Sequence, residues 1–145
     1  MNLRRANVQD LQAVHQIRQA AILGIVSDDL SRVECLQWAA KRSPDYFAPR
    51  LEHGTMLLAE NAEGQVVGWG STEGERIEGL YVRPDCGGQG VGRRLMAALE
   101  GHIRQRGHRQ ARLAASANAV GFYRQLGYVP LGPMKNKAVP MIKEL

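Results

Sequence analysis

Residues 86–95 read Cys86-Gly87-Gly88-Gln89-Gly90-Val91-Gly92-Arg93-Arg94-Leu95, and the rest of the chain is interpreted as a scaffold for this loop. It holds four glycines within six residues, and a helical pattern follows directly. A short apolar run at 77–82 and the turn Arg83-Pro84-Asp85 precede it, so the order is strand, turn, glycine-rich loop, helix. Glycines let backbone amides approach a ligand, and a helix start adds unpaired N–H groups and partial positive charge. The stretch therefore predicts a site for a phosphate-bearing ligand.

The composition is that of one globular domain spanning residues 1–145. Hydrophobic residues make up 44% of the chain and charged residues 23%, which is ordinary for such a domain. No apolar run approaches the roughly 20 residues that cross a bilayer. The first seven residues lack the apolar core of a signal peptide. We therefore expect a cytoplasmic protein without a membrane partner.

The net charge of +5 is concentrated in residues 93–112, which hold six arginines and one glutamate. Such an excess beside a phosphate-type loop favours an anionic ligand. Nucleic acid is not expected as a partner, because no aromatic interleaving or binding motif accompanies the arginines. Two cysteines, Cys35 and Cys86, and four histidines without ligand spacing predict no metal site.

Along the chain, residues 7–54 carry helical periodicity, with Asn7 and Ser31 as helix caps. The remaining chain alternates between strands and helices, and the helix at 90–105 has an inward-facing stripe of Val91, Leu95, Leu99 and Ile103. Strands are predicted at residues 3–6, 55–60, 65–71, 76–82, 111–115, 128–131 and 138–143. This order predicts an α/β (α+β) fold, in which helices flank a single mixed, mostly antiparallel sheet.

The residue order of the glycine-rich loop excludes two commoner nucleotide-binding loops, the P-loop and the dinucleotide-binding loop. The run G-x-x-x-x-G-K-[ST] does not occur, and neither frame of G-x-G-x-x-G ends on glycine, because Arg93 or Leu95 stands there. A second informative stretch runs from Asn118 to Tyr128. There Asn118 is expected to cap a short helix whose Phe122 and Leu126 face inward, while Tyr123 turns elsewhere.

Together the two stretches resemble the GNAT superfamily of acetyl-CoA-dependent N-acetyltransferases. The resemblance rests on Leu80-Tyr81-Val82-x-Pro84, the loop at 87–95, and Asn118-Ala119-x-x-Phe122-Tyr123-x-x-x-Gly127-Tyr128. The family loop usually reads [RQ]-x-x-G-x-[GA], and here Gly87 occupies the arginine or glutamine position. Arg93 or Arg94 can supply the missing charge.

The resemblance implies that the chain binds acetyl-CoA. The pyrophosphate would lie on the amides of 87–93, and the pantetheine arm would pair with the strand edge at 80–82 and contact Asn118. A bulge near Gly79 would splay this strand from the next. The residues implied in cofactor binding are Leu80, Tyr81, Val82, Gly87, Gly88, Gln89, Gly90, Val91, Gly92, Arg93, Arg94, Asn118 and Tyr123.

The implied chemistry is direct attack of a neutral amine on the thioester. A backbone N–H near Leu80 or Tyr81 would polarise the carbonyl, and Tyr123 would act as the general acid. Glu78 is the candidate base, directly or through a water, and Glu73 is the alternative; Glu78 can equally be a surface residue or an ion-pair partner. Cys86 is interpreted as a loop residue, because no histidine is placed to activate it.

The acceptor is expected to be a small-molecule amine that contacts residues 25–38 and 134–137. Asp28, Asp29 and Glu34 could attract a cationic amine, while Trp38 and Tyr46 could stack on its body. Equally, Asp28 and Asp29 could only cap a helix, and Trp38 could belong to the core. Two alternatives stay open, a peptide or protein N-terminus as acceptor and a non-catalytic acetyl-CoA sensor. Dimers are common in the family, while the sequence leaves the oligomeric state open.

Overall fold

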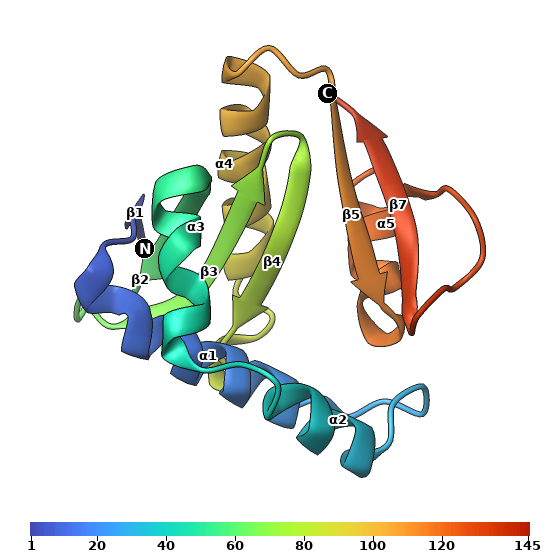
Figure 1. The fold of residues 1–145 in the computed structure, drawn as a ribbon, viewed down its shortest axis with the longest axis horizontal. Helices are drawn as coiled ribbons and strands as arrows, with labels where there is room; N and C mark the ends of the chain where they lie inside the picture. The colour runs from blue at the N-terminus through green and yellow to red at the C-terminus, as the bar shows by residue number, and fades with distance from the viewer.

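The structure is a computed structural model that describes residues 1–145. A seven-stranded sheet in the order β1-β2-β3-β4-β5-β7-β6 forms its centre, with helices around it (Figure 1). The strands are β1 (Asn2–Arg5), β2 (Thr55–Glu60), β3 (Val66–Glu73), β4 (Arg76–Val82), β5 (Gln110–Ser116), β6 (Val129–Pro130) and β7 (Ala138–Glu144). The α-helices are α1 (Leu11–Leu23), α2 (Arg32–Ala39), α3 (Ala48–His53), α4 (Val91–Gln105) and α5 (Val120–Gln125). Short 3-10 helices cover Val8–Asp10, Pro44–Phe47, Pro84–Cys86 and Ala117–Ala119.

The sheet is mixed because one neighbouring pair, β4 and β5, runs parallel, while all other pairs are antiparallel. β4 and β5 share only the register pair Arg76 and Arg112. The Arg112 amide also donates to the Glu75 carbonyl at 3.0 Å. Beyond this point the two strands diverge, as Figure 1 shows between the green β4 and the orange β5. The mixed, mostly antiparallel sheet and its splayed strand pair are thus confirmed.

Both faces of the sheet are covered, which explains why β2 is buried along nearly its whole length. Successive side chains of a strand point to opposite faces. Leu57 and Ala59 accordingly join the core beneath α4, while Met56 and Leu58 join the core beneath α1. In that second core Trp69 donates its indole N–H to the Val14 carbonyl at 2.9 Å, which fixes α1 against β3.

Helix α4 is the largest element on its face of the sheet. Its predicted stripe of Val91, Leu95, Leu99 and Ile103 is fully buried, so the period read from the sequence is confirmed. The same helix carries a buried carboxylate, Glu100, which accepts hydrogen bonds from Tyr128 Oη at 2.7 Å and Lys143 Nζ at 3.0 Å. Since Lys143 lies in β7, this network fixes the C-terminal part of the sheet to α4.

The N-terminal helices begin where the sequence predicts. Asn7 forms a capping box with Asp10 before α1, and Ser31 forms one with Glu34 before α2. In each box the cap side chain accepts from a backbone amide, and the carboxylate accepts from the backbone amide of the cap residue. The two capping boxes fix where α1 and α2 begin, and both helices border the candidate site.

The segment around α5 differs from the expectation. Asn118 does not cap the helix: it lies within the 3-10 turn Ala117–Ala119, and its Oδ1 accepts a hydrogen bond from Ser116 Oγ at 2.8 Å. Tyr123 is the buried residue of α5, whereas Phe122 and Leu126 are only partly buried against the core. A helix of six residues has too few turns for its apolar period to define one inward face.

Candidate active site

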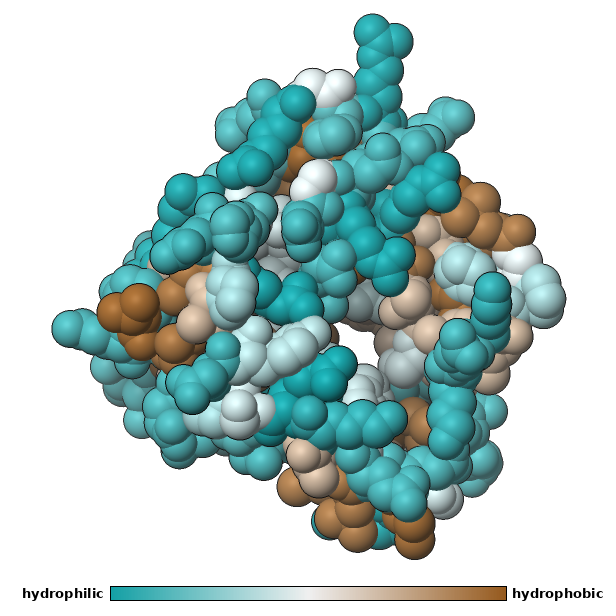
Figure 2. Space-filling view, viewed as in Figure 1, coloured by the Kyte–Doolittle hydropathy of each residue, from teal (hydrophilic) through white to brown (hydrophobic).

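A cavity of about 480 Å³ occupies the space where β4 and β5 separate. Its walls come from β4 and β5, from α1 and α2, from the segment that begins α5, and from the turn at 136–138. Figure 2 shows the hollow at the centre of this face as an opening between the two parts of the sheet. The cavity follows from the strand topology, because side chains of a continuous sheet would leave no gap at this place.

A bulge in β4 lies on the wall of this cavity. Ser71 pairs with Gly79 and Thr72 pairs with Ile77, so Glu78 is an extra residue without a partner on β3. A Cβ on Gly79 would lie 3.1 Å from the Trp69 ring, so the bend fits closely against the core. Bulges bend a strand and turn a side chain to a new direction. Here the bulge places Glu78 on the cavity wall, and the bulge predicted near Gly79 is observed.

Tyr123 enters the cavity from the opposite side. The residue is 9% exposed, and its ring packs edge-on against Phe122 and Tyr128, with centroids 5.1 and 5.9 Å away. No protein group forms a hydrogen bond with its hydroxyl, although Tyr123 lines the cavity. Burial, and to a smaller extent Tyr81, raises the pKa of Tyr123 well above its ordinary value. The hydroxyl is therefore protonated at neutral pH and can donate to a group in the cavity.

The glycine-rich loop lies exposed between the short helix at 84–86 and α4. Gly88 and Gly90 have φ values of +75° and +81°, a conformation that glycine adopts without strain. The amides of residues 88–93 donate no hydrogen bond within the protein, and the first intrahelical donor is Arg94, to the Gly90 carbonyl at 3.0 Å. This row of amides without a partner in the protein, at the positive end of α4, fits a pyrophosphate group.

The remaining predicted cofactor contacts lie along one path from the loop to the cavity. Leu80, Tyr81 and Val82 form the cavity side of β4, and Asn118 faces them from the segment that precedes α5. Gly92 allows close packing of the loop on α5, because a Cβ there would lie 3.2 Å from the Phe122 ring. The structure thus brings the glycine-rich loop, the strand edge and the Asn118 to Tyr123 segment together.

Gly87 stands where the family usually has arginine or glutamine, and the loop is well formed despite this difference. Gly87 is extended, and its amide donates to the Pro84 carbonyl at 3.3 Å. Arg93 and Arg94 are both exposed, and Arg94 donates to the Met1 carbonyl at 3.4 Å. Cys86 is half-buried, and burial followed by the nearby Asp85 charge raises the pKa of its thiol. A thiol with a raised pKa is a poor nucleophile, in agreement with its interpretation as a loop residue.

The two candidate bases have different surroundings. Glu78 lines the cavity and is ion-paired with Arg76 at 3.3 Å and, more loosely, with Arg50 at 3.9 Å. Glu73 is exposed at the end of β3 and lines neither this cavity nor the smaller one beside it. Of the two carboxylates, only Glu78 can reach a ligand in the cavity.

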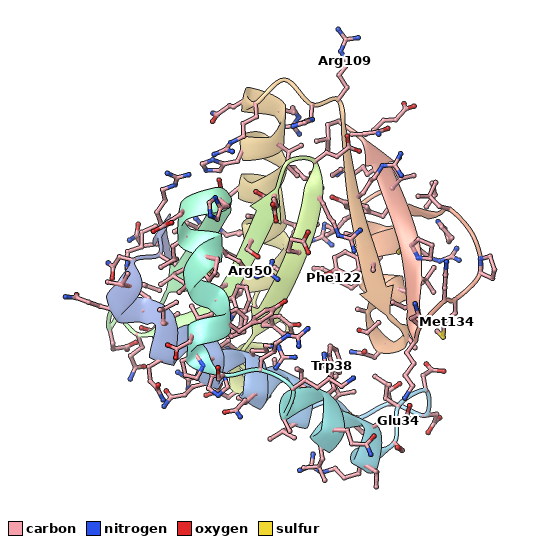
Figure 3. The ribbon with its side chains drawn as sticks, in the orientation of Figure 1. Glu34, Trp38, Arg50, Arg109, Phe122 and Met134 are labelled. Atoms are coloured by element: carbon pink, nitrogen blue, oxygen red, sulfur yellow. The ribbon has the colours of Figure 1, made fainter.

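The predicted acceptor residues divide into two groups. Trp38 and Glu34 line the cavity from α2, as Figure 3 shows for both labelled side chains. Glu34 also forms an ion pair with Lys137 at 3.3 Å, and this contact joins α2 to the turn before β7. Asp28 and Asp29 are exposed and outside the cavity lining, and Asp29 instead forms a local turn with Ser27.

The sequence reasoning missed three arginines beside the cavity, Arg18, Arg42 and Arg50. They come from α1, from the loop after α2 and from α3. Arg42 and Arg50 share an i, i+4, i+8 spacing with Tyr46, whereas no spacing links Arg18 to them. This spacing is the signal that the sequence carries, and in the structure the Arg42 guanidinium lies 4.2 Å from the centroid of the Tyr46 ring.

Comparison with known proteins agrees with this geometry. A family model described as an acetyltransferase (GNAT) domain matches residues 26–145, and the chain belongs to this family. Mycothiol acetyltransferase of Saccharomonospora viridis is 39% identical over 88 residues, which are 50% of this chain and 29% of that protein. The chain spans less than half the length of the curated relatives that it matches.

Solved structures share the fold over nearly the whole chain. A GCN5-related N-acetyltransferase from Rhodopseudomonas palustris has a TM-score of 0.89 and 33% identity, covering 99% of this chain and 95% of its own. PaiA N-acetyltransferase from Thermoplasma acidophilum, solved in complex with coenzyme A, has a TM-score of 0.82 and 18% identity, with 99% and 98% covered. GNAT enzymes use acetyl-CoA, and the resemblance read from the sequence is confirmed at the level of the family.

No group of three or more His, Cys, Asp or Glu side chains is arranged to hold a metal ion. No helix has both the length and the apolar character that crossing a membrane requires.

Proposed function

We propose that this protein transfers the acetyl group of acetyl-CoA to a primary amine of a small molecule. The observation that carries the proposal is the position of Tyr123, whose unpaired, protonated hydroxyl faces β4 and its bulge across the cavity. Acetyl-CoA supplies a thioester, whose acyl group is open to attack by an amine. The residues of the chain would bind this molecule, orient it and move protons.

Binding would use backbone groups for the most part. The amides of 88–93 hold the pyrophosphate, because they have no other partner and lie at the helix start. The edge of β4 at 80–82 is free of β5 and can pair with the pantetheine arm, as one strand pairs with another. Asn118 faces the same arm from the opposite wall.

Proton movement would use two side chains. Tyr123 Oη holds the proton that the departing sulfur needs, and burial keeps that proton in place at neutral pH. Glu78 accepts the proton of the attacking amine, directly or through a water, because it is the carboxylate on the cavity wall beside the bulge. A backbone N–H of Leu80 or Tyr81 would stabilise the negative charge on the carbonyl oxygen.

A small acceptor is favoured over a peptide or protein N-terminus. A peptide needs a groove open at both ends, whereas here the Lys137–Glu34 ion pair at 3.3 Å joins α2 to the turn before β7. A cavity of about 480 Å³ also lies within the range that accommodates small ligands, about 300–1,000 Å³.

The test is release of free thiol from acetyl-CoA in the presence of a broad panel of primary amines, with the acetylated product identified by mass spectrometry. We expect turnover with at least one amine and none without an amine. Tight acetyl-CoA binding without turnover on any amine would favour the sensor alternative. Absence of acetyl-CoA binding in calorimetry would contradict the proposed cofactor site.

A further inference from the structure

A second, smaller cavity of about 130 Å³ lies beside the first. The two cavities share the residues Arg18, Trp38, Arg42, Glu78 and Tyr81, so they are separated by one layer of side chains that includes the candidate base. The small cavity continues past Glu78 toward α3 and the 3-10 helix Pro44–Phe47. An acceptor whose amine lies beside Glu78 therefore has space for a second group on the side away from Tyr123.

The walls of the small cavity carry an excess of positive charge. Three arginines and one carboxylate, Glu78, line it. Glu78 also forms an ion pair with Arg76, which does not line the small cavity. The ion pair between Glu78 and Arg50 is loose, at 3.9 Å. Arg42 has no carboxylate partner, since its one hydrogen bond goes to the Lys41 carbonyl at 3.3 Å. Such an excess favours a negatively charged group in the cavity.

Arg18 has a structural role in the wall of the small cavity and is not one of the groups proposed to bind the ligand. The residue is 5% exposed, and its guanidinium donates to the carbonyls of Trp38 and Ala39 at 3.2 and 3.4 Å. Its charge has no carboxylate partner either, so it adds to the positive potential inside the cavity.

Arg42 and Arg50 are both positioned by the same ring. Their guanidinium carbons lie 4.2 and 5.0 Å from the ring centroid of Tyr46, and Arg50 Nη2 donates to Tyr46 Oη at 2.6 Å. Burial alone would raise the pKa of Tyr46, but the hydrogen bond from Arg50 and both positive charges lower it. The stacking limits the freedom of the two side chains before any ligand arrives. Figure 3 shows Arg50 extending from α3 toward the strands.

Ser71 provides an independent sign that a ligand belongs here. The residue is 2% exposed and lines the small cavity, yet its Oγ is buried without a hydrogen-bond partner. It lies two residues after Trp69 on β3, on the same face of the sheet as α1. A buried hydroxyl without a partner costs free energy, and an oxygen atom of a bound ligand would satisfy it.

We infer that the acceptor is an amino acid or a closely similar compound, whose carboxylate binds between Arg42 and Arg50 with Ser71 donating to it, while its amine lies beside Glu78. This inference rests on the proposed acetyl transfer. Guanidinium groups match a carboxylate with two parallel hydrogen bonds, and the bound carboxylate would replace Glu78 as the partner of Arg50. The same oxyanion chemistry would hold a phosphonate, which the test distinguishes.

The test compares matched acceptors on the intact protein: amino acids, their carboxamides, the parent amines without a carboxylate, and the aminophosphonates. We expect kcat/KM for the best amino acid to exceed that of its carboxamide by about 10- to 100-fold, the range of a charge-assisted hydrogen-bond pair. Higher turnover of the aminophosphonate would assign the site to phosphonates. Equal turnover of acid and carboxamide would overturn the inference and leave the proposed acetyl transfer intact.

The variants Arg42→Gln and Arg50→Gln test whether the preference for a carboxylate arises in the small cavity. Each is expected to raise KM for the amino acid about tenfold or more and to change KM for the carboxamide by a clearly smaller factor, so that the preference for the acid falls. Arg109→Gln is the matched control, because Arg109 is exposed and points away from the cavities (Figure 3). An unchanged preference for the acid in both cavity variants would overturn the inference.

A binding measurement covers the case in which no panel amine is acetylated. N-acetyl amino acids and their amides are titrated into the wild-type protein with coenzyme A, and the backbone signals of Ser71, Arg42 and Arg50 are followed by NMR. We expect saturable shifts with the acids and none with the amides. If the acids produce no shifts at these residues, the carboxylate site does not exist.

Discussion

At the scale of single residues, Tyr123 differs from Tyr128, the other buried tyrosine. It is buried, its hydroxyl has no partner in the protein, and burial raises its pKa. Tyr128 is also buried, but its hydroxyl is committed to Glu100 at 2.7 Å. Of these two buried tyrosines, only Tyr123 therefore has a hydroxyl that is free to donate to a ligand.

Replacing Tyr123 by phenylalanine removes the hydroxyl and keeps the ring contacts. We expect kcat for acetyl transfer to fall about 10²-fold or more, the usual contribution of a general acid. The dissociation constant for coenzyme A and the thermal midpoint are expected to change little, because the packed ring remains. A normal kcat in this variant would exclude Tyr123 as the proton donor.

A second residue-scale effect concerns stability at low pH. Asp10 accepts two hydrogen bonds from Arg4, both at 2.8 Å, and one from the Asn7 amide. The Arg4 hydrogen bonds first, against some desolvation, lower the pKa of Asp10 below its ordinary value. A lowered pKa in the folded state means that the stabilisation is present above the unfolded pKa, about 3.9, and is lost as the pH falls below it.

We therefore expect Asp10→Asn to lower the free energy of unfolding by about 1–2 kcal/mol at pH 7, as for the loss of charged hydrogen bonds. The difference from wild type should shrink in urea titrations as the pH falls below about 4, because the wild-type carboxylate then becomes protonated. A difference that stays constant over this pH range would contradict the assigned pKa direction.

At the scale of elements, the junction between α3 and β2 depends on a glycine. A Cβ on Gly54 would lie 2.2 Å from the Thr72 carbonyl oxygen, a backbone atom of β3. Gly101, in the middle of α4, has no atom within 4 Å of its added Cβ. Substitution by alanine is therefore expected to change the stability of the protein in opposite directions at the two glycines.

Gly54→Ala is expected to destabilise the protein by about 3 kcal/mol, the upper part of the usual range for overpacking. Gly101→Ala should stabilise it by about 0.5–1 kcal/mol, since alanine favours the helix interior. Thermal unfolding of both variants beside the wild type measures the two shifts. A loss of stability in Gly101→Ala, or none in Gly54→Ala, would show that the backbone packing described here is wrong.

Elements with a clear local pattern could be predicted from the sequence. β2 and β4 lie at the predicted residues, and the stripe of α4 is buried as expected, because period and turn residues are local signals. The inward position of Tyr123 could not be predicted, because α5 has only six residues. Asn118 does not cap the helix as the sequence predicts, because its side chain accepts a hydrogen bond from Ser116 instead.

At the scale of the whole molecule, the candidate active site exists because two strands separate. β4 and β5 meet at Arg76 and Arg112 and then diverge, and three remote parts of the chain close the space between them. The topology could be predicted through the family resemblance. The arginine cavity could not, because Arg18, Arg42 and Arg50 come together only through the packing of α1, α3 and the loop after α2.

The most direct test of the cofactor site is a titration of the labelled protein with coenzyme A, followed in backbone amide NMR spectra. The structure leaves the amides of 88–93 unpaired and the β4 edge at 80–82 free of β5. We expect the largest shifts at these residues and at 118–123, and none at β1 or β6 on the outer edges of the sheet. Saturable shifts centred elsewhere, or no shift at 88–93, would contradict the account.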